Sequence, residues 1–145
     1  MAYAEKTKVP VDRSQAEIRK ILSKHGASGF AFAEQVEKAL VQFDIEGRRI
    51  RFFLPLAVKG QTQNKKRYIM GQNEVDQTNR SKWRGLALAI KAKLECVESG
   101  ITTLEQEFMA HIALPNGQTV GDLVLPEIAK SYQEKAMPSL LGMRQ

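Results

Sequence analysis

Residues 41–56, Val41-Gln-Phe-Asp-Ile-Glu-Gly-Arg-Arg-Ile-Arg-Phe-Phe-Leu-Pro-Leu56, decide the fold. Apolar and polar side chains alternate on both sides of Gly47, which is the pattern of strands with one buried face. The turn around Glu46-Gly47-Arg48 joins them as an antiparallel hairpin. Pro55 cannot donate a ladder hydrogen bond, so the second strand is expected to end there or to lie at a sheet edge.

The segment before this hairpin predicts a helix followed by another strand. Ser14 and Glu17 have the spacing of a capping box, which predicts that a helix begins at Ser14, and Gly26 is placed to end it. Phe30 and Phe32 then alternate with small residues, which indicates a third strand. A sheet with one apolar face needs a helical layer above it.

Helices are predicted to follow the sheet. Residues 59–78, rich in Gln, Asn, Gly and Lys, are expected to form a long basic loop. A long helix is predicted from Asn79 to about Glu98, with its apolar side formed by Trp83, Leu86, Ala87, Ile90, Leu94 and Val97.

Two shorter helices are predicted beyond Gly100. Thr102 and Glu105 form a second candidate capping box, and residues 114–117 indicate a turn. A last helix is expected over residues 120–136, with a break or a first-turn start at Pro126. The order of elements predicts one α+β domain, residues 1–145, with the helices packed on one sheet face and flexible ends at 1–8 and 138–145.

Composition limits the classes of function. The 145 residues contain 22 Lys and Arg against 16 Asp and Glu, a net charge of +6 that favours polyanionic partners, nucleic acid first. One cysteine excludes an intramolecular disulfide. No signal peptide or membrane-spanning stretch is evident, so a cytoplasmic location is expected.

Three candidate chemical sites have simpler structural interpretations. Glu107 and His111, four residues apart on a predicted helix, have metal-ligand spacing, with Asp122 as the nearest further ligand, but a surface pair or a core histidine is the favoured interpretation. Asp44 and Glu46 are typical of strand carboxylates in nucleases, yet cross-strand pairing with arginine is favoured. Cys96 is expected to be a buried, inert thiol. No catalytic residue, metal or cofactor is therefore predicted.

Clusters of basic residues are the stronger signal. A mobile basic loop with a stacking side chain suits single-stranded nucleic acid. If the loop at 59–78 folds back over the hairpin, three clusters would merge into one positive surface. The candidate nucleic-acid-binding residues are Arg48, Arg49, Arg51, Lys65, Lys66, Arg67, Tyr68, Arg80, Lys82 and Arg84.

Several stretches of the chain carry a resemblance to one group of proteins. They are Val9–Leu22, Gly26–Phe30, Gly47–Leu56, Lys82–Glu95, Glu98–Thr103 and Glu107–Ile112. Across residues 9–125 the chain resembles small proteins of tailed phages and prophages. The group has no assigned function, so the resemblance implies a phage setting and no catalytic residues. The element order is also similar to the core of single-strand annealing recombinases, which is an analogy of fold alone.

The sequence thus predicts a non-enzymatic, phage-type nucleic-acid-binding accessory protein. Single-strand binding or annealing in replication or recombination is its expected role, and an edge strand favours a homo-oligomer. A protein-binding inhibitor of a host defence or replication factor is the alternative, with the Tyr68-Ile69-Met70 segment as an apolar anchor. A metal-dependent nuclease is a third and weaker interpretation.

Overall fold

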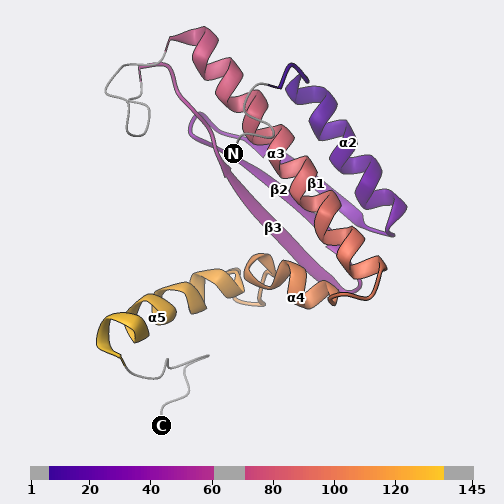
Figure 1. Ribbon diagram of the computed structural model, residues 1–145, viewed down its shortest axis with the longest axis vertical. Helices are drawn as coiled ribbons and strands as arrows, with labels where there is room; N and C mark the ends of the chain where they lie inside the picture. Colours follow the sequence, from indigo (N-terminus) through magenta and orange to yellow (C-terminus); the bar gives the residue numbers. More distant parts are fainter. Residues whose placement is uncertain (1–6, 61–70, 136–145) are drawn as a thin grey trace.

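A computed structural model describes residues 7–60 and 71–135 of the chain. It confirms the α+β class, with an N-terminal helix, a three-stranded antiparallel sheet and then further helices (Figure 1). The elements are α2 (Val11–Lys24), β1 (Ser28–Glu34), β2 (Lys38–Ile45), β3 (Arg48–Pro55), α3 (Gln72–Glu98), α4 (Leu104–Phe108), the short 3-10 helix η1 (Met109–His111) and α5 (Val120–Glu134). The predicted flexible ends lie outside the described residues, except for residues 7 and 8.

The predicted hairpin is confirmed. Ile45 pairs with Arg48, so only Glu46 and Gly47 form the turn, and both have positive φ angles of 48° and 74°. Two consecutive left-handed residues make the type I′ turn, whose twist matches that of the strands it joins. The sheet order is β1-β2-β3, so β3 is an edge strand and ends at Pro55, as expected.

The core lies between one face of the sheet and helices α2, α3 and α4. Val41, Phe43, Ile50 and Phe52 are buried on this face, which we call the covered face. The rings of Phe43 and Phe52 stack at 6.5 Å, and Phe108 of α4 meets both edge-on. The apolar side of α3 packs on these buried side chains of the sheet, and Trp83 is only 1% exposed. The predicted core role of Trp83 is thereby confirmed.

Helix α2 begins earlier than the capping signal predicted. It starts at Val11, because the carbonyl of Pro10 accepts hydrogen bonds from the backbone nitrogens of Arg13 and Ser14. Proline fixes its own φ and favours the start of a helix. Ser14 is therefore not a cap: its side chain is fully buried inside the helix, without a hydrogen-bond partner among the described residues.

Helix α3 also begins earlier than predicted, at Gln72 instead of Asn79, so residues 72–78 are not part of a loop. Tertiary contacts explain the difference. Val75 is buried against Ala57, and the Asn79 side chain both donates to the carbonyl and accepts from the amide of Ala57. These contacts stabilise the first two turns of α3, in which Asn73, Asp76 and Thr78 have low helix propensity.

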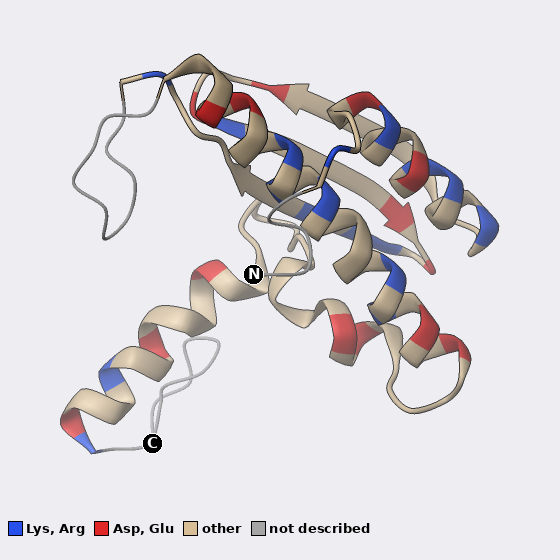
Figure 2. Cartoon of the chain, turned by 45° about the horizontal axis from the view of Figure 1, so that its top comes forward, with Lys and Arg blue, Asp and Glu red and all other residues tan. Residues whose placement is uncertain are grey.

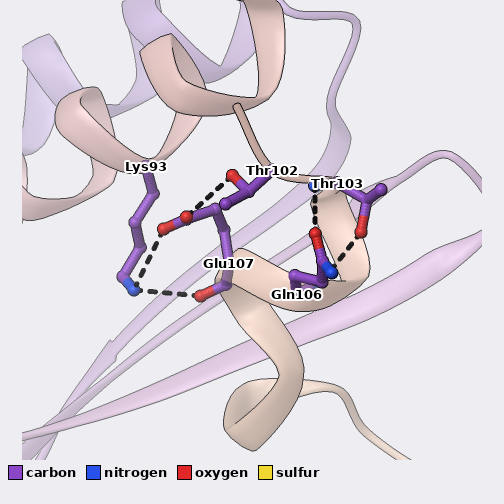
Figure 3. A network of polar contacts seen from close by, with 5 residues as sticks. All are labelled: Lys93, Thr102, Thr103, Gln106 and Glu107. Carbon is purple, nitrogen blue, oxygen red and sulfur yellow. Dashed lines mark hydrogen bonds and ion pairs between the residues drawn. The ribbon is translucent and has the colours of Figure 1, made fainter. Parts of the chain in front are cut away.

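A polar network fixes the start of α4 against the end of α3 (Figure 3). The capping box consists of Thr103 and Gln106, one residue later than predicted. Thr102 instead donates its hydroxyl to Glu107, at 2.8 Å. Lys93 of α3 donates to the backbone carbonyl of Glu107 at 2.9 Å and lies 3.8 Å from its carboxylate.

Helix α5 differs from the prediction that every helix packs on the sheet. It runs without a break through Pro126 and begins at a capping box of Thr119 and Asp122. Only Gly121 is buried, where the helix meets η1, and the rest extends away from the sheet (Figure 1). None of the helices within the described residues is long and apolar enough to cross a membrane.

Candidate nucleic-acid interface

The sheet face opposite the covered one carries polar and basic side chains, and we call it the open face. Because paired residues share a face, the register places Gln42 beside Arg51, Asp44 beside Arg49, and Leu40 beside Phe53. None of these side chains is buried. The open face is therefore available for binding along the length of the hairpin.

Two arginines of the open face are held by cross-strand partners. Arg49 donates from Nε to Asp44 at 3.0 Å, and this hydrogen bond and the Asp44 charge raise the pKa of Arg49. Arg51 donates to the side-chain oxygen of Gln42 at 3.1 Å and to the carbonyl of Gly117 at 2.8 Å. The predicted pairing of Asp44 with arginine is confirmed. Both guanidinium groups thus have hydrogen-bond partners beside the strand that carries them.

An exposed aromatic ring lies next along the same strand. Phe53 is 54% exposed, and the ammonium group of Lys38 lies 5.0 Å from its ring centroid. Neither residue was among the sequence candidates. The signal for Phe53 was present, since Phe52 and Phe53 are adjacent and a strand turns one of two neighbours toward solvent.

An open hollow lies where the hairpin end meets the segment after η1. It has a volume of about 610 Å³ and is lined by Arg48, Arg49, Arg51 and Asp44 and by residues of segment 113–117. We call it the arginine hollow. Arg48 lines the hollow too, but its side chain belongs to the other side of the strand, since Arg48 pairs with the buried Ile45 and its guanidinium lies 3.7 Å from Glu105. The third arginine of the predicted hairpin cluster is thus close to the other two without sharing the open face.

The predicted cluster on α3 lies elsewhere. Arg80 lines a groove with Leu56, which directly follows β3, whereas Arg48 begins that strand. An eight-residue strand is about 26 Å long, so the two clusters lie at opposite ends of the sheet. Figure 2 shows basic residues spread over α2, α3 and the strands rather than gathered in one place.

The basic side chains of α3 also have hydrogen-bond or ion-pair partners or are partly buried. Arg84 forms an ion pair with Glu17 of α2, and Arg80 donates to Gln77 at 2.7 Å. Lys82 is half-buried, and burial lowers its pKa. Arg84 therefore contributes to the contact between α2 and α3. The other candidates, Lys65, Lys66, Arg67 and Tyr68, lie outside the described residues.

The candidate metal ligands do not converge. Glu107 is engaged by Lys93 and Thr102, and the ring of His111 stacks on Phe52 with centroids 4.0 Å apart. Burial and the nearby Lys93 charge lower the pKa of His111. Asp122 caps α5. Within residues 7–60 and 71–135, no group of three or more His, Cys, Asp or Glu side chains is placed to hold a metal ion. Cys96 is half-buried rather than buried.

Comparison of the chain with protein-family models, with curated proteins and with solved structures finds no match. The resemblance to small phage proteins stays a prediction.

Proposed function

We propose that this protein is a non-enzymatic, phage-type accessory protein that binds single-stranded nucleic acid on the open face. The observation that supports it is a row of Arg49, Arg51 and Phe53 along one strand, with Lys38 beside the ring. Successive members of such a row are about 6.6 Å apart. Cations beside an exposed aromatic ring are the combination that single-strand binders use for phosphates and unstacked bases.

The chemistry of the row favours a single strand over a duplex. An aromatic ring stacks on a base only when that base is unpaired at its face, whereas a duplex presents base edges and phosphates. Within residues 7–60 and 71–135, the open face is formed by strands of a three-stranded sheet and not by a helix that could enter the major groove. Binding is therefore expected to depend on salt and to be weakly selective for sequence.

Fluorescence anisotropy with labelled single-stranded DNA, single-stranded RNA and duplex DNA across a salt series tests the proposal. The logarithm of the association constant should fall linearly with the logarithm of the salt concentration. Replacing Arg49 and Arg51 by Gln should reduce that slope by about 1.4, the value for two phosphate contacts on a single strand. Phe53→Ser should weaken binding about tenfold or more and leave the slope unchanged.

A matched control removes the same charge elsewhere. Lys20 and Lys24 are exposed on α2, so Lys20→Gln with Lys24→Gln lowers the net charge equally without touching the open face. This double variant should retain the wild-type salt slope within about 0.3. Equal losses from both double variants would show that binding follows net charge alone, against a site on the open face. No binding at low salt would contradict the proposal outright.

A protein-binding factor that inhibits a host enzyme is the second candidate function. The observation that favours it is the apolar side of α5, where Leu125 is 60% exposed, Ile128 40% and Tyr132 82%. Paired variants separate the two functions. Leu125→Ser with Tyr132→Ser should leave nucleic-acid binding unchanged if the open face is the site. A loss of that binding would instead assign nucleic-acid binding to α5.

Self-association is also part of the proposal. Among the described residues, β1 pairs with β2 only and leaves its outer edge without a strand partner. Unpaired edges favour pairing between chains. Sedimentation equilibrium with and without a short oligonucleotide should detect a dimer or larger assembly, and a monomer at every concentration would exclude it.

A further inference from the structure

One side of helix α5 is apolar from its first turn to its last. Residues at intervals of three or four lie on the same side of a helix, and here they are Gly121, Leu125, Ile128 and Tyr132. This apolar side begins in a contact with η1, where Gly121 packs so closely that an added Cβ would lie 2.8 Å from the Ala110 carbonyl oxygen. Beyond that contact the other three side chains are exposed.

The apolar side of α5 carries no charged residue over its central turns. Successive residues of a helix are rotated by about 100°, which places Glu127, Lys130 and Glu134 on the opposite side. The residues that flank the apolar side are uncharged as well, and they are Val124, Ala129 and Ser131. This surface can therefore meet a copy of itself without bringing like charges together.

Helix α5 has little support from the other described residues. It packs on η1 through its first turn, and the rest extends away from the sheet (Figure 1). Pro126, in the second turn, has no N–H for the helical hydrogen bond. A helix of 15 residues is marginal in water by itself. Contact of its apolar side with another surface would therefore stabilise it.

We propose that the apolar side of α5 binds the same side of α5 in a second copy of the chain, with the two helices antiparallel. A two-fold axis near Ile128 places the two Ile128 side chains against each other and Leu125 against Tyr132 of the second copy. Antiparallel packing also brings the positive N-terminal end of each helix beside the negative C-terminal end of the other. Two-fold pairs are the commonest assemblies of identical chains.

The size of the contact makes the dimer weak and reversible. The exposed part of the apolar side, residues 125–132, covers only about 12 Å of the helix axis. Such a contact buries less than the roughly 1,200–2,000 Å² of a standard interface. The dimer should therefore dissociate on dilution.

Sedimentation velocity over about 10–500 µM protein, without nucleic acid, tests the contact. Ile128→Glu and Ile128→Lys each place two like charges at the two-fold axis, so each variant alone should raise the dimer dissociation constant about tenfold or more. An equimolar mixture of the two variants should dimerise at least as well as the wild type, because glutamate then meets lysine. This rescue requires that residue 128 of one copy lies against residue 128 of the other.

Ile101→Glu is the matched control. Ile101 is more exposed than Ile128 but lies in the loop between α3 and α4. This variant should dimerise like the wild type, within about twofold, and a loss as large as that of Ile128→Glu would show that association follows exposed apolar area and not α5. Circular dichroism of each variant reports whether it is folded, and the mixing experiment repeats that check in one sample.

Three results would overturn this inference. A wild-type chain that stays monomeric up to about 500 µM would leave the apolar side of α5 for a different protein. A dimer that persists in both Ile128 variants would place the contact elsewhere, at the edge of β1 for example. Absence of rescue on mixing would exclude contact at the two-fold axis. None of these results bears on the binding of single strands, because the α5 contact does not depend on the proposed function.

Discussion

The two faces of the three-stranded sheet differ in burial and in the kind of contact that their side chains make. On the covered face, Val41, Phe43, Ile50 and Phe52 are buried beneath helices and belong to the hydrophobic core. On the open face, the neighbouring residues of the same strands are half-buried or exposed and pair through hydrogen bonds. Because successive residues of a strand point to opposite faces, each strand contributes to stability with one set and to the candidate site with the other.

The two faces also differ in how much their contacts contribute to the free energy of folding. Fully burying a large apolar side chain contributes about 1.5–3 kcal/mol, whereas an exposed ion pair contributes about 0–1 kcal/mol. The covered face should therefore tolerate little change, and the open face should tolerate substitution at small cost in stability. Side chains on the open face are free to serve binding.

Phe43→Ala should have the largest effect on stability. Phe43 is fully buried and contacts both Phe52 and Phe108, so its removal leaves a cavity among the three rings. The free energy of unfolding in urea should fall by about 3–5 kcal/mol. The matched control is Phe53→Ala on the open face, which should cost less than about 1 kcal/mol. Similar losses for both would contradict the division between the faces.

Gly29→Ala should have the next largest effect on stability, because a side chain at Gly29 would contact Asp44 on the open face. Its φ is +62°, and an added Cβ would lie 2.7 Å from an Asp44 carboxylate oxygen. We expect a loss of about 1–3 kcal/mol in thermal or urea unfolding.

The control for Gly29→Ala is Gly26→Ala. Gly26 has a φ of +83° and nothing within 4 Å of an added Cβ, so it carries the backbone strain alone. The additional loss at Gly29 should disappear in the Gly29→Ala, Asp44→Ala double variant. Persistence of that loss would show that the contact with Asp44 is not its cause.

Ser14→Ala should stabilise the protein by about 1 kcal/mol. The Ser14 hydroxyl is buried without a hydrogen-bond partner among the described residues, which is costly, and alanine is the better helix former. Ser23→Ala, at an exposed position of the same helix, is the control and reports helix propensity alone. A gain at Ser14 no larger than that at Ser23 would show that the buried hydroxyl costs nothing.

Much of the fold was predictable from the sequence, because it depends on local pattern. The alternation through residues 41–56 and the Glu46-Gly47 turn determine the hairpin, and the apolar side of α3 determines the packing of Trp83. The errors occur where tertiary contacts override local signals. Buried Val75 and the bonds between Asn79 and Ala57 extend α3 beyond its predicted start, and no pattern within residues 72–78 contains that information.

The candidate site was less predictable, because proximity between clusters depends on the fold. The arginines at 48, 49 and 51 were identified from their crowding in the sequence, and the alternation of the strand already places Arg48 on the side of Ile50, opposite Arg49 and Arg51. The cluster on α3 has the same composition, yet the fold places it at the other end of the sheet, where Arg84 pairs with Glu17. Phe53 and Lys38 become neighbours only through the register of β2 and β3.

The smallest effect should come from the ion pair between Asp44 and Arg49. Both side chains are more than a third exposed, so a double-mutant cycle with alanine should give only a small coupling between them, and salt should reduce it further. Binding should respond in the opposite direction to stability. Asp44→Asn removes the negative charge from the open face and releases Arg49, so affinity for single strands at low salt should rise as stability falls slightly. A coupling that salt does not reduce, or weaker binding by Asp44→Asn, would mean that this pair maintains the structure of the open face instead of limiting its positive charge.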